Sequence, residues 1–212
     1  MSQSRFRSTS RSHRLLRIVG VDDGPFSARR RGLAKTILVA VLLEGPKIID
    51  LRVGTIEVDG VDAHRILLSL LNTLSYNVVM LSGVSFGGFN LVDIKELAGR
   101  TGKPVIAVIR ERPNNKAVQD ALREHFEDWR SRWRVVENAG RLYSCKPVAE
   151  EPRLYFEVRG ASPVFARRVI ASASFISRLP EAVRVAGIVA KGLRARSSFY
   201  EIDQANLQGL QI

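Results

Sequence analysis

The chain has 212 residues, which suits one domain, and 45% of them are hydrophobic, which is enough for a buried core. No run of about 18 apolar residues is present, and no apolar segment with a cleavage site follows the basic N-terminus, so we expect a cytoplasmic protein without a membrane partner. The single cysteine excludes an internal disulfide framework, and we expect no disulfide-linked partner. The single cysteine and the three histidines are scattered along the chain and do not form the ligand spacing of a zinc site.

The net charge of +12 is unevenly distributed along the chain. Residues 1–35 hold nine Lys or Arg and two Asp, a net of +7, which leaves +5 for the other 177 residues. Such an excess of positive charge indicates an anionic partner, with nucleic acid (DNA or RNA) ahead of a membrane surface. The alternative is that the arginine content reflects a GC-rich or thermophilic genome and no nucleic acid is bound.

The N-terminal part of the sequence predicts an arm followed by three strands. Residues 1–14 are rich in serine and arginine and hold too little apolar surface to fold, so we expect a mobile basic arm. Apolar runs predict strands at 15–21, 36–43 and 48–58. The short turn between the second and third strands cannot hold a crossover helix, so these two strands form an antiparallel hairpin.

After residue 62, helical and strand patterns alternate. We expect helices at 63–74, 91–99, 117–130, 163–176 and 180–193, buried strands at 78–81 and 104–109, and short strands near 134–136 and 155–158. The order β-β-β-α-β-α-β, with strand two antiparallel and a helical C-terminal part, predicts an α/β fold. Its sheet is of the ribonuclease H-like mixed type, with helices on both faces. We expect a single domain over 15–200 and a tail at 201–212.

Polar residues follow three strands that should be neighbours in this sheet. Ligands of such sheets gather at the carboxyl ends of the parallel strands, which here carry Asp22, Ser82 and Arg110. Carboxylate oxygens suit Mg²⁺ or Mn²⁺, so Asp22 is the first candidate metal ligand. Asp23 points to the opposite face of a strand and suits the turn at Gly24 better. The alternative is that both aspartates only cap this turn.

Further candidates lie in the loops that follow. Asp59 and Asp62, between the third strand and the first helix, are candidate metal ligands, although an Asp-Gly turn and a helix N-cap explain them equally well. The glycine-rich stretch "MLSGVSFGGFNLVD" leads into a helix, where backbone N–H groups favour phosphate. The alternative is that its glycines serve tight packing. The phosphate-binding candidates here are Ser82, Gly83, Ser85, Gly87 and Gly88.

Arginines supply the remaining candidates. Arg110 and Arg112 follow the fifth strand, where a guanidinium can clamp a phosphate or stabilise transition-state charge. Alternatively, they pair with neighbouring carboxylates and serve the structure alone. Between the first two strands, three consecutive cations are expected to contact nucleic-acid phosphates: Arg29, Arg30 and Arg31.

Five segments of the sequence resemble a known family. "GVDDGPF", "EVDGVDA", "LSGVSFGGFNLVDI", "KPVIAVIRERP" and "RLPEAVRVAG" resemble an uncharacterised, mostly archaeal family, the domain-of-unknown-function family ninety-nine, which is similar to endonuclease V. The resemblance covers nearly the whole chain after about residue 15. It implies a ribonuclease H-like fold and an enzyme that cuts nucleic-acid strands near deaminated bases, using Mg²⁺ held by carboxylates.

Residue by residue, the resemblance places Asp22 on the first-strand aspartate of endonuclease V and Arg110 on the lysine after its fifth strand. These two residues are therefore the catalytic candidates. Asp59 and Asp62 are nearest to the middle glutamate of endonuclease V, which has no clear equivalent here.

One departure from endonuclease V concerns the metal. Ser82 stands where endonuclease V carries an aspartate, and a neutral hydroxyl is a poor substitute for an anionic ligand. Asp93, near the start of the next helix, is the candidate that compensates. The resemblance thus implies a Mg²⁺- or Mn²⁺-dependent endonuclease that Ser82 weakens or inactivates. The alternative is a non-catalytic nucleic-acid-binding protein on a degenerate nuclease fold.

Overall fold

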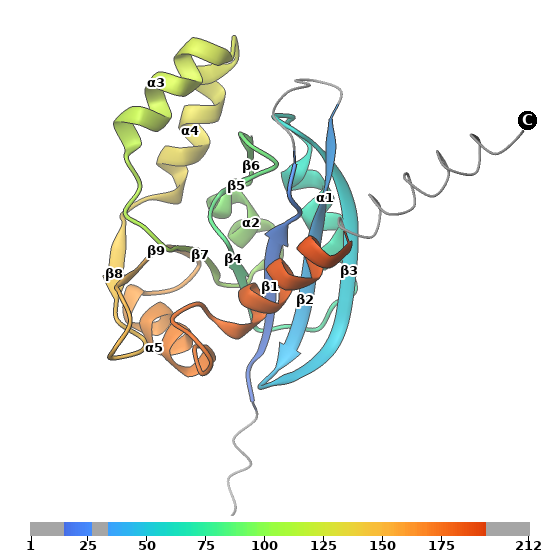
Figure 1. The fold of residues 1–212 in the computed structure, drawn as a ribbon, viewed down its shortest axis with the longest axis vertical. Coiled ribbons are helices and arrows are strands. Elements are labelled where there is room, and N and C mark those ends of the chain that lie inside the picture. The colour runs from blue at the N-terminus through green and yellow to red at the C-terminus, as the bar shows by residue number, and fades with distance from the viewer. Residues whose placement is uncertain (1–14, 27–33, 194–212) are drawn as a thin grey trace, which may run out of the picture.

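The computed structural model describes residues 15–26 and 34–193, and a seven-stranded mixed sheet runs through them (Figure 1). Its strands follow the order β3-β2-β1-β4-β7-β9-β8. Their bounds are β1 Arg17–Asp23, β2 Lys35–Glu44, β3 Lys47–Glu57, β4 Val78–Leu81, β7 Val105–Ile109, β8 Tyr143–Cys145 and β9 Leu154–Arg159. Strands β1, β4 and β7 are parallel, whereas β2, β3, β9 and β8 each pair antiparallel with their neighbours. This confirms the predicted ribonuclease H-like α/β fold.

Helices cover both faces of the sheet, which is why the central strands are apolar throughout rather than alternating. In Figure 1, α1 (Ala63–Leu71) and α2 (Ile94–Thr101) lie behind the sheet, and α5 (Pro163–Ala173) and a helix over 181–193 lie in front. One buried cluster joins Val19 and Val21 of β1 to Leu67 of α1, and a second joins Ile18 to Val183 on the other face. The carboxyl ends of β1, β4 and β7 are thereby held between two cores.

Two predicted elements in the middle of the chain are wrong. The helix expected at 117–130 is two helices, α3 (Asn115–His125) and α4 (Trp129–Ala139), because Phe126 takes an extended conformation between them. The strand expected near 134–136 lies inside α4. The segment is helical, and Arg132 and Ala139, seven residues apart, lie on its buried side. The strand expected near 155–158 is confirmed as part of β9.

A small hairpin stands beyond the main sheet, formed by β5 (Ser85–Phe86) and β6 (Asn90–Leu91). It occupies the glycine-rich stretch between β4 and α2. The arm predicted at 1–14, the tail predicted at 201–212 and Arg29–Arg31 lie outside the described residues. Among the described helices, none is long and apolar enough to cross a bilayer.

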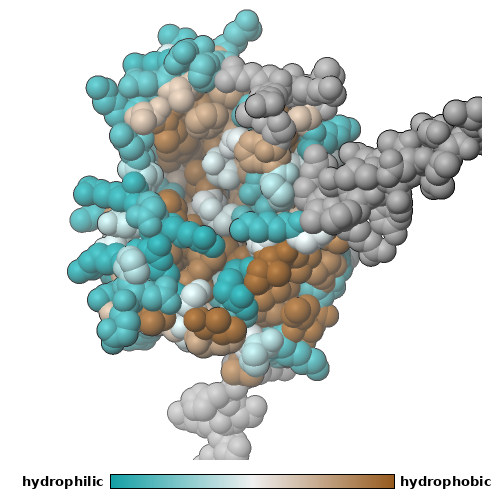
Figure 2. All heavy atoms as spheres, in the orientation of Figure 1, coloured by the Kyte–Doolittle hydropathy of each residue, from teal (hydrophilic) through white to brown (hydrophobic). Residues whose placement is uncertain are grey.

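The helix over 181–193 lies directly on the backbone of β1. A Cβ atom added at Gly20 would come within 2.0 Å of the carbonyl carbon of Ala182 and 2.4 Å of the amide nitrogen of Val183. Farther along this helix, a Cβ added at Gly187 would lie 2.4 Å from Oδ2 of Asp22. Figure 2 shows apolar surface down the middle of the face that carries this helix, bordered by hydrophilic side chains. The helix therefore sits as close to the strand as two glycines allow.

We predict that Gly20→Ala destabilises the protein by about 1–3 kcal/mol, since the added methyl group has no space and the helix must move. The free energy of unfolding from urea titration measures this. The matched control is Gly99→Ala on α2, where a Cβ meets no atom within 4 Å. Alanine there is expected to stabilise the helix by about 0.5–1 kcal/mol. Equal stability of Gly20→Ala and the wild type would contradict the close packing.

Candidate functional site

Three strand ends surround one cavity, as the topology predicts. Asp22 is the second-last residue of β1, Ser82 follows β4 and Arg110 follows β7. Together with Lys191 from the helix over 181–193, they line a cavity of about 330 Å³. The apolar part of its wall comes from Val108, Ile109 and Leu179. The cavity thus holds one carboxylate, one hydroxyl and two cationic side chains.

The side chain of Asp22 is held by two hydrogen bonds to the same oxygen. The Ser82 hydroxyl donates to Asp22 Oδ1 at 2.5 Å, and the backbone N–H of Asp23 donates to it at 3.0 Å. A short O–H···O⁻ distance is typical of a charge-assisted bond. Ser82 is itself fixed, because its N–H donates to the carbonyl of Val21 at 3.0 Å. Asp22 and Ser82 therefore form a tightly positioned pair.

Burial under the helix raises the pKa of Asp22 above its usual value. The hydrogen bonds from Ser82 and from the N–H of Asp23, and then the positive charges of Arg110 and Lys191, act against this rise without cancelling it. Sequence reasoning missed Lys191. The signal was available in its spacing: Lys191 lies four residues after Gly187, on the side of the helix that meets Asp22.

Asp23 has a different role from Asp22. Its Oδ2 accepts a hydrogen bond from the backbone N–H of Gly87 at 2.6 Å, so its side chain reaches the β5–β6 hairpin and not the cavity. Burial raises the pKa of Asp23 and the nearby charge of Asp22 raises it further, whereas the bond from Gly87 lowers it. The sequence assigned Asp23 to the turn at Gly24. The structure gives it a partner 64 residues away.

Asp59 and Asp62, both predicted as metal ligands, also hold the hairpin. Asp59 Oδ1 accepts from the N–H of Phe89 at 2.9 Å, and Asp62 Oδ1 accepts from the side-chain amide of Asn90 at 2.6 Å. Asp62 occupies the N-cap position of α1, as the alternative interpretation expected, but its side chain makes no cap hydrogen bond. The hydrogen bonds of these two carboxylates support the structural alternative.

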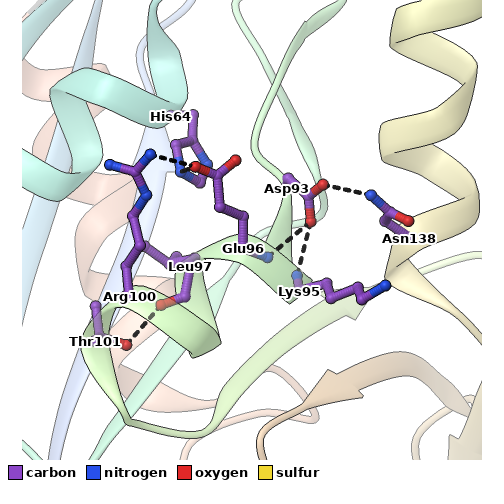
Figure 3. A network of polar contacts seen from close by, with 8 residues as sticks. All are labelled: His64, Asp93, Lys95, Glu96, Leu97, Arg100, Thr101 and Asn138. Atoms are coloured by element: carbon purple, nitrogen blue, oxygen red, sulfur yellow. Dashed lines mark hydrogen bonds and ion pairs between the residues drawn. The ribbon is translucent and has the colours of Figure 1, made fainter.

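Asp93 caps α2 (Figure 3). One of its oxygens accepts from the N–H groups of Lys95 and Glu96 at 2.9 and 3.0 Å, and the other accepts from the amide of Asn138 on α4 at 2.6 Å. The adjacent Glu96 pairs with Arg100 at 2.7 Å. Both oxygens of Asp93 are thus used to begin α2 and to join it to α4.

The donor set around the cavity does not fit Mg²⁺ or Mn²⁺. Within residues 15–26 and 34–193, no three of His, Cys, Asp and Glu gather closely enough to hold a metal ion. The four predicted ligands are therefore not brought together. Asp22 is the carboxylate that lines the cavity, and beside it lie the neutral Ser82 and the cations Arg110 and Lys191, which oppose a further positive charge.

The glycine-rich stretch divides into a packed part and an open part. Gly88 has a φ of +88°, and a Cβ there would collide with Asp59 Oδ1, so glycine is required for packing. A Cβ at Gly83, by contrast, meets no atom within 4 Å. Gly83 and Ser85 line a second cavity of about 220 Å³. Phosphate contact by this loop and by the exposed Arg112 stays a prediction.

Ser82 also lines this second cavity, as does Glu157 of β9. Glu157 pairs with Ala107 across the sheet and is only 8% exposed. Burial raises its pKa to about 7, although the positive charge of Arg159 acts in the opposite direction. Sequence reasoning missed this residue as well. The signal was a glutamate inside the apolar strand "LYFEVR".

The fold defines a class of protein: α/β proteins with a ribonuclease H-like mixed sheet, similar in fold to endonuclease V. Endonuclease V of Ciona intestinalis, solved in complex with a DNA containing an inosine followed by a ribo-adenosine, superimposes with a TM-score of 0.54 at 14% identity, covering 89% of this chain and 87% of that one. Such low identity supports the fold alone.

The particular family follows from the sequence comparison. The family model described as Endonuclease dU matches residues 14–194, and the chain belongs to this family. It is 38% identical over 183 residues to a UPF0215 protein of Methanothermobacter thermautotrophicus, covering 84% of this chain and 87% of that protein. A protein of unknown function from Archaeoglobus fulgidus superimposes with a TM-score of 0.74 at 27% identity, covering 84% of this chain and 98% of that one.

We predict that Glu157 makes the stability of the protein fall as pH rises. Its pKa is raised from 4.5 to about 7 in the folded chain. Between these values the folded chain keeps a proton that the unfolded chain has lost, so the free energy of unfolding decreases across this window. The loss approaches about 3 kcal/mol at most. Urea unfolding at pH 5 and pH 8 measures it.

Glu157→Gln is expected to flatten this pH dependence, because glutamine remains neutral at both pH values. The control is Glu150→Gln, which changes an exposed glutamate and should keep the wild-type slope. A Glu157→Gln protein that loses as much stability as the wild type between pH 5 and pH 8 would refute the assignment.

Proposed function

We propose that the chain is an endonuclease that hydrolyses a phosphodiester bond of DNA containing deoxyuridine. Its membership of the Endonuclease dU family supports this reaction and substrate. The observation that carries the proposal is the cavity at the strand ends, where Arg110 and Lys191 face the Asp22–Ser82 pair. Two cations beside a hydrogen-bonded carboxylate form a site for one phosphate group next to a proton acceptor.

The three charged residues of the cavity each have a role in this reaction. The guanidinium of Arg110 binds the phosphate oxygens and stabilises the charge that develops on them. The ammonium group of Lys191, on the helix over 181–193, adds a second positive charge. Asp22, whose pKa is raised by burial, accepts a proton. Because the donor set does not fit a divalent metal ion, no step is assigned to Mg²⁺ or Mn²⁺.

The charge of the whole chain supports nucleic-acid binding. A net charge of +12 attracts a polyanion, and each phosphate contact releases counterions, so affinity falls with salt. Endonuclease V of Ciona intestinalis was solved with DNA bound, which is in line with a DNA partner for this fold.

The second candidate function is a nucleic-acid-binding protein without catalysis. It is favoured by one observation: within the described residues, no three of His, Cys, Asp and Glu gather closely enough to hold a metal ion. The resemblance to endonuclease V, which places Ser82 on an aspartate, points the same way. This candidate predicts salt-dependent binding of DNA or RNA without strand cleavage. End-labelled single strands and duplexes with one deoxyuridine, one inosine or neither, incubated with Mg²⁺, with Mn²⁺ or with chelator, separate the two candidates.

We predict that Arg110→Ala and Lys191→Ala each lower the cleavage rate at least about 10-fold and reduce the salt slope of DNA binding by about one, since each removes a phosphate contact. Fluorescence anisotropy at several salt concentrations gives the slope. Arg65→Ala on the exposed side of α1 is the matched control and should keep the wild-type slope and rate. Wild-type slopes and rates in the two cavity variants would place the phosphate elsewhere.

A further inference from the structure

We propose that Ser82 is the nucleophile of the cleavage reaction and that Asp22 is its general base, so that cleavage proceeds through a phosphoserine-linked strand. The inference rests on the proposed function and names the group that attacks the phosphate. It follows from the combination of side chains at the cavity, which is the one expected for serine-based phosphoryl transfer.

The geometry of the nucleophile and its base supports this assignment. The Ser82 hydroxyl already donates a hydrogen bond to Asp22 Oδ1 at 2.5 Å, within the reach that general-base activation requires. The base is oriented in turn, because the N–H of Asp23 donates to the same oxygen and Gly187 packs against the other. Nucleophile, base and orienting group are therefore all in place.

The position of Ser82 relative to the phosphate site also supports the assignment. Ser82 is partly exposed and lines the cavity that Arg110 and Lys191 also line. A phosphate held by these two cations lies in the same space as the hydroxyl oxygen. The cations also stabilise the charge that builds on the phosphorus oxygens during attack. Arg110 and Lys191 thus supply the positive charge that the transition state of the attack requires.

The reaction balances without a further reactant. In the first half, Ser82 Oγ forms a bond to phosphorus and the bond from phosphorus to one sugar oxygen breaks. The Ser82 proton passes to Asp22, and the leaving oxygen takes a proton from Lys191. In the second half, water attacks phosphorus and gives a proton to Lys191, while Ser82 leaves and recovers its proton from Asp22. The net change is hydrolysis of one phosphodiester bond.

The experiment captures the covalent intermediate. The scissile phosphate is mapped with the wild type, and the substrate is then made with a bridging sulfur on either side of that phosphate. A thiolate leaves without a proton, so Lys191→Ala completes the first half-reaction but lacks the base for the second. We expect an SDS-resistant protein–DNA adduct to accumulate in this variant, in the presence of chelator, with the added mass on the peptide that contains Ser82.

Ser82→Ala is expected to form no adduct. Its rate of cleavage of unmodified DNA is expected to fall by at least about 1,000-fold. Ser69→Ala, an exposed hydroxyl on α1, is the matched control and should behave as the wild type. Equal thermal unfolding of the two variants shows that Ser82→Ala is folded.

The outcomes separate the two proposals. Cleavage by the wild type without any adduct, or cleavage by Ser82→Ala at the wild-type rate, overturns the role of Ser82 and leaves the proposed function standing. Cleavage that requires Mg²⁺ or Mn²⁺ and yields no adduct does the same and assigns the attack to water. No cleavage of any substrate by the wild type overturns the proposed function, and the role of Ser82 with it.

Discussion

The contact between β1 and the helix over 181–193 is the constraint on which the centre depends. Gly20 lets the helix lie on the strand backbone, and Gly187 leaves space for the carboxylate of Asp22. This contact removes water from Asp22, which raises its pKa, and it brings Lys191 to the same cavity. A side chain at either glycine would push the helix away from β1. Asp22 would then be less buried, and Lys191 would lie farther from it.

The acidic residues near this centre show how one residue type serves two purposes. Asp22 lines the cavity, whereas Asp23, Asp59 and Asp62 bind the β5–β6 hairpin through its backbone or through Asn90. Arg132 secures the hairpin from α4 by donating to the carbonyl of Phe89 at 2.6 Å. Carboxylates that a sequence pattern suggests as metal ligands here act as hydrogen-bond acceptors that shape a loop.

The sequence predicted most of the fold because apolar runs and the short turns between them determine strand order. It also predicted that Asp22, Ser82 and Arg110 meet, since the ends of neighbouring parallel strands share one edge. It could not predict the contributions of Lys191 and Glu157. Which helix covers which strand depends on close packing at a few glycines, and the raised pKa of a buried carboxyl depends on surroundings that come from distant parts of the chain.

Gly20 also has a meaning for comparison among relatives. A position that admits no side chain cannot vary while its neighbour stays in place, so any sequence change there must be accompanied by a displaced helix. The residue aligned with Gly20 in another member of the family therefore indicates how close the equivalent of the 181–193 helix lies to the equivalent of β1 in that protein. A single letter of sequence in this way carries information about the depth at which the strand-end aspartate is buried.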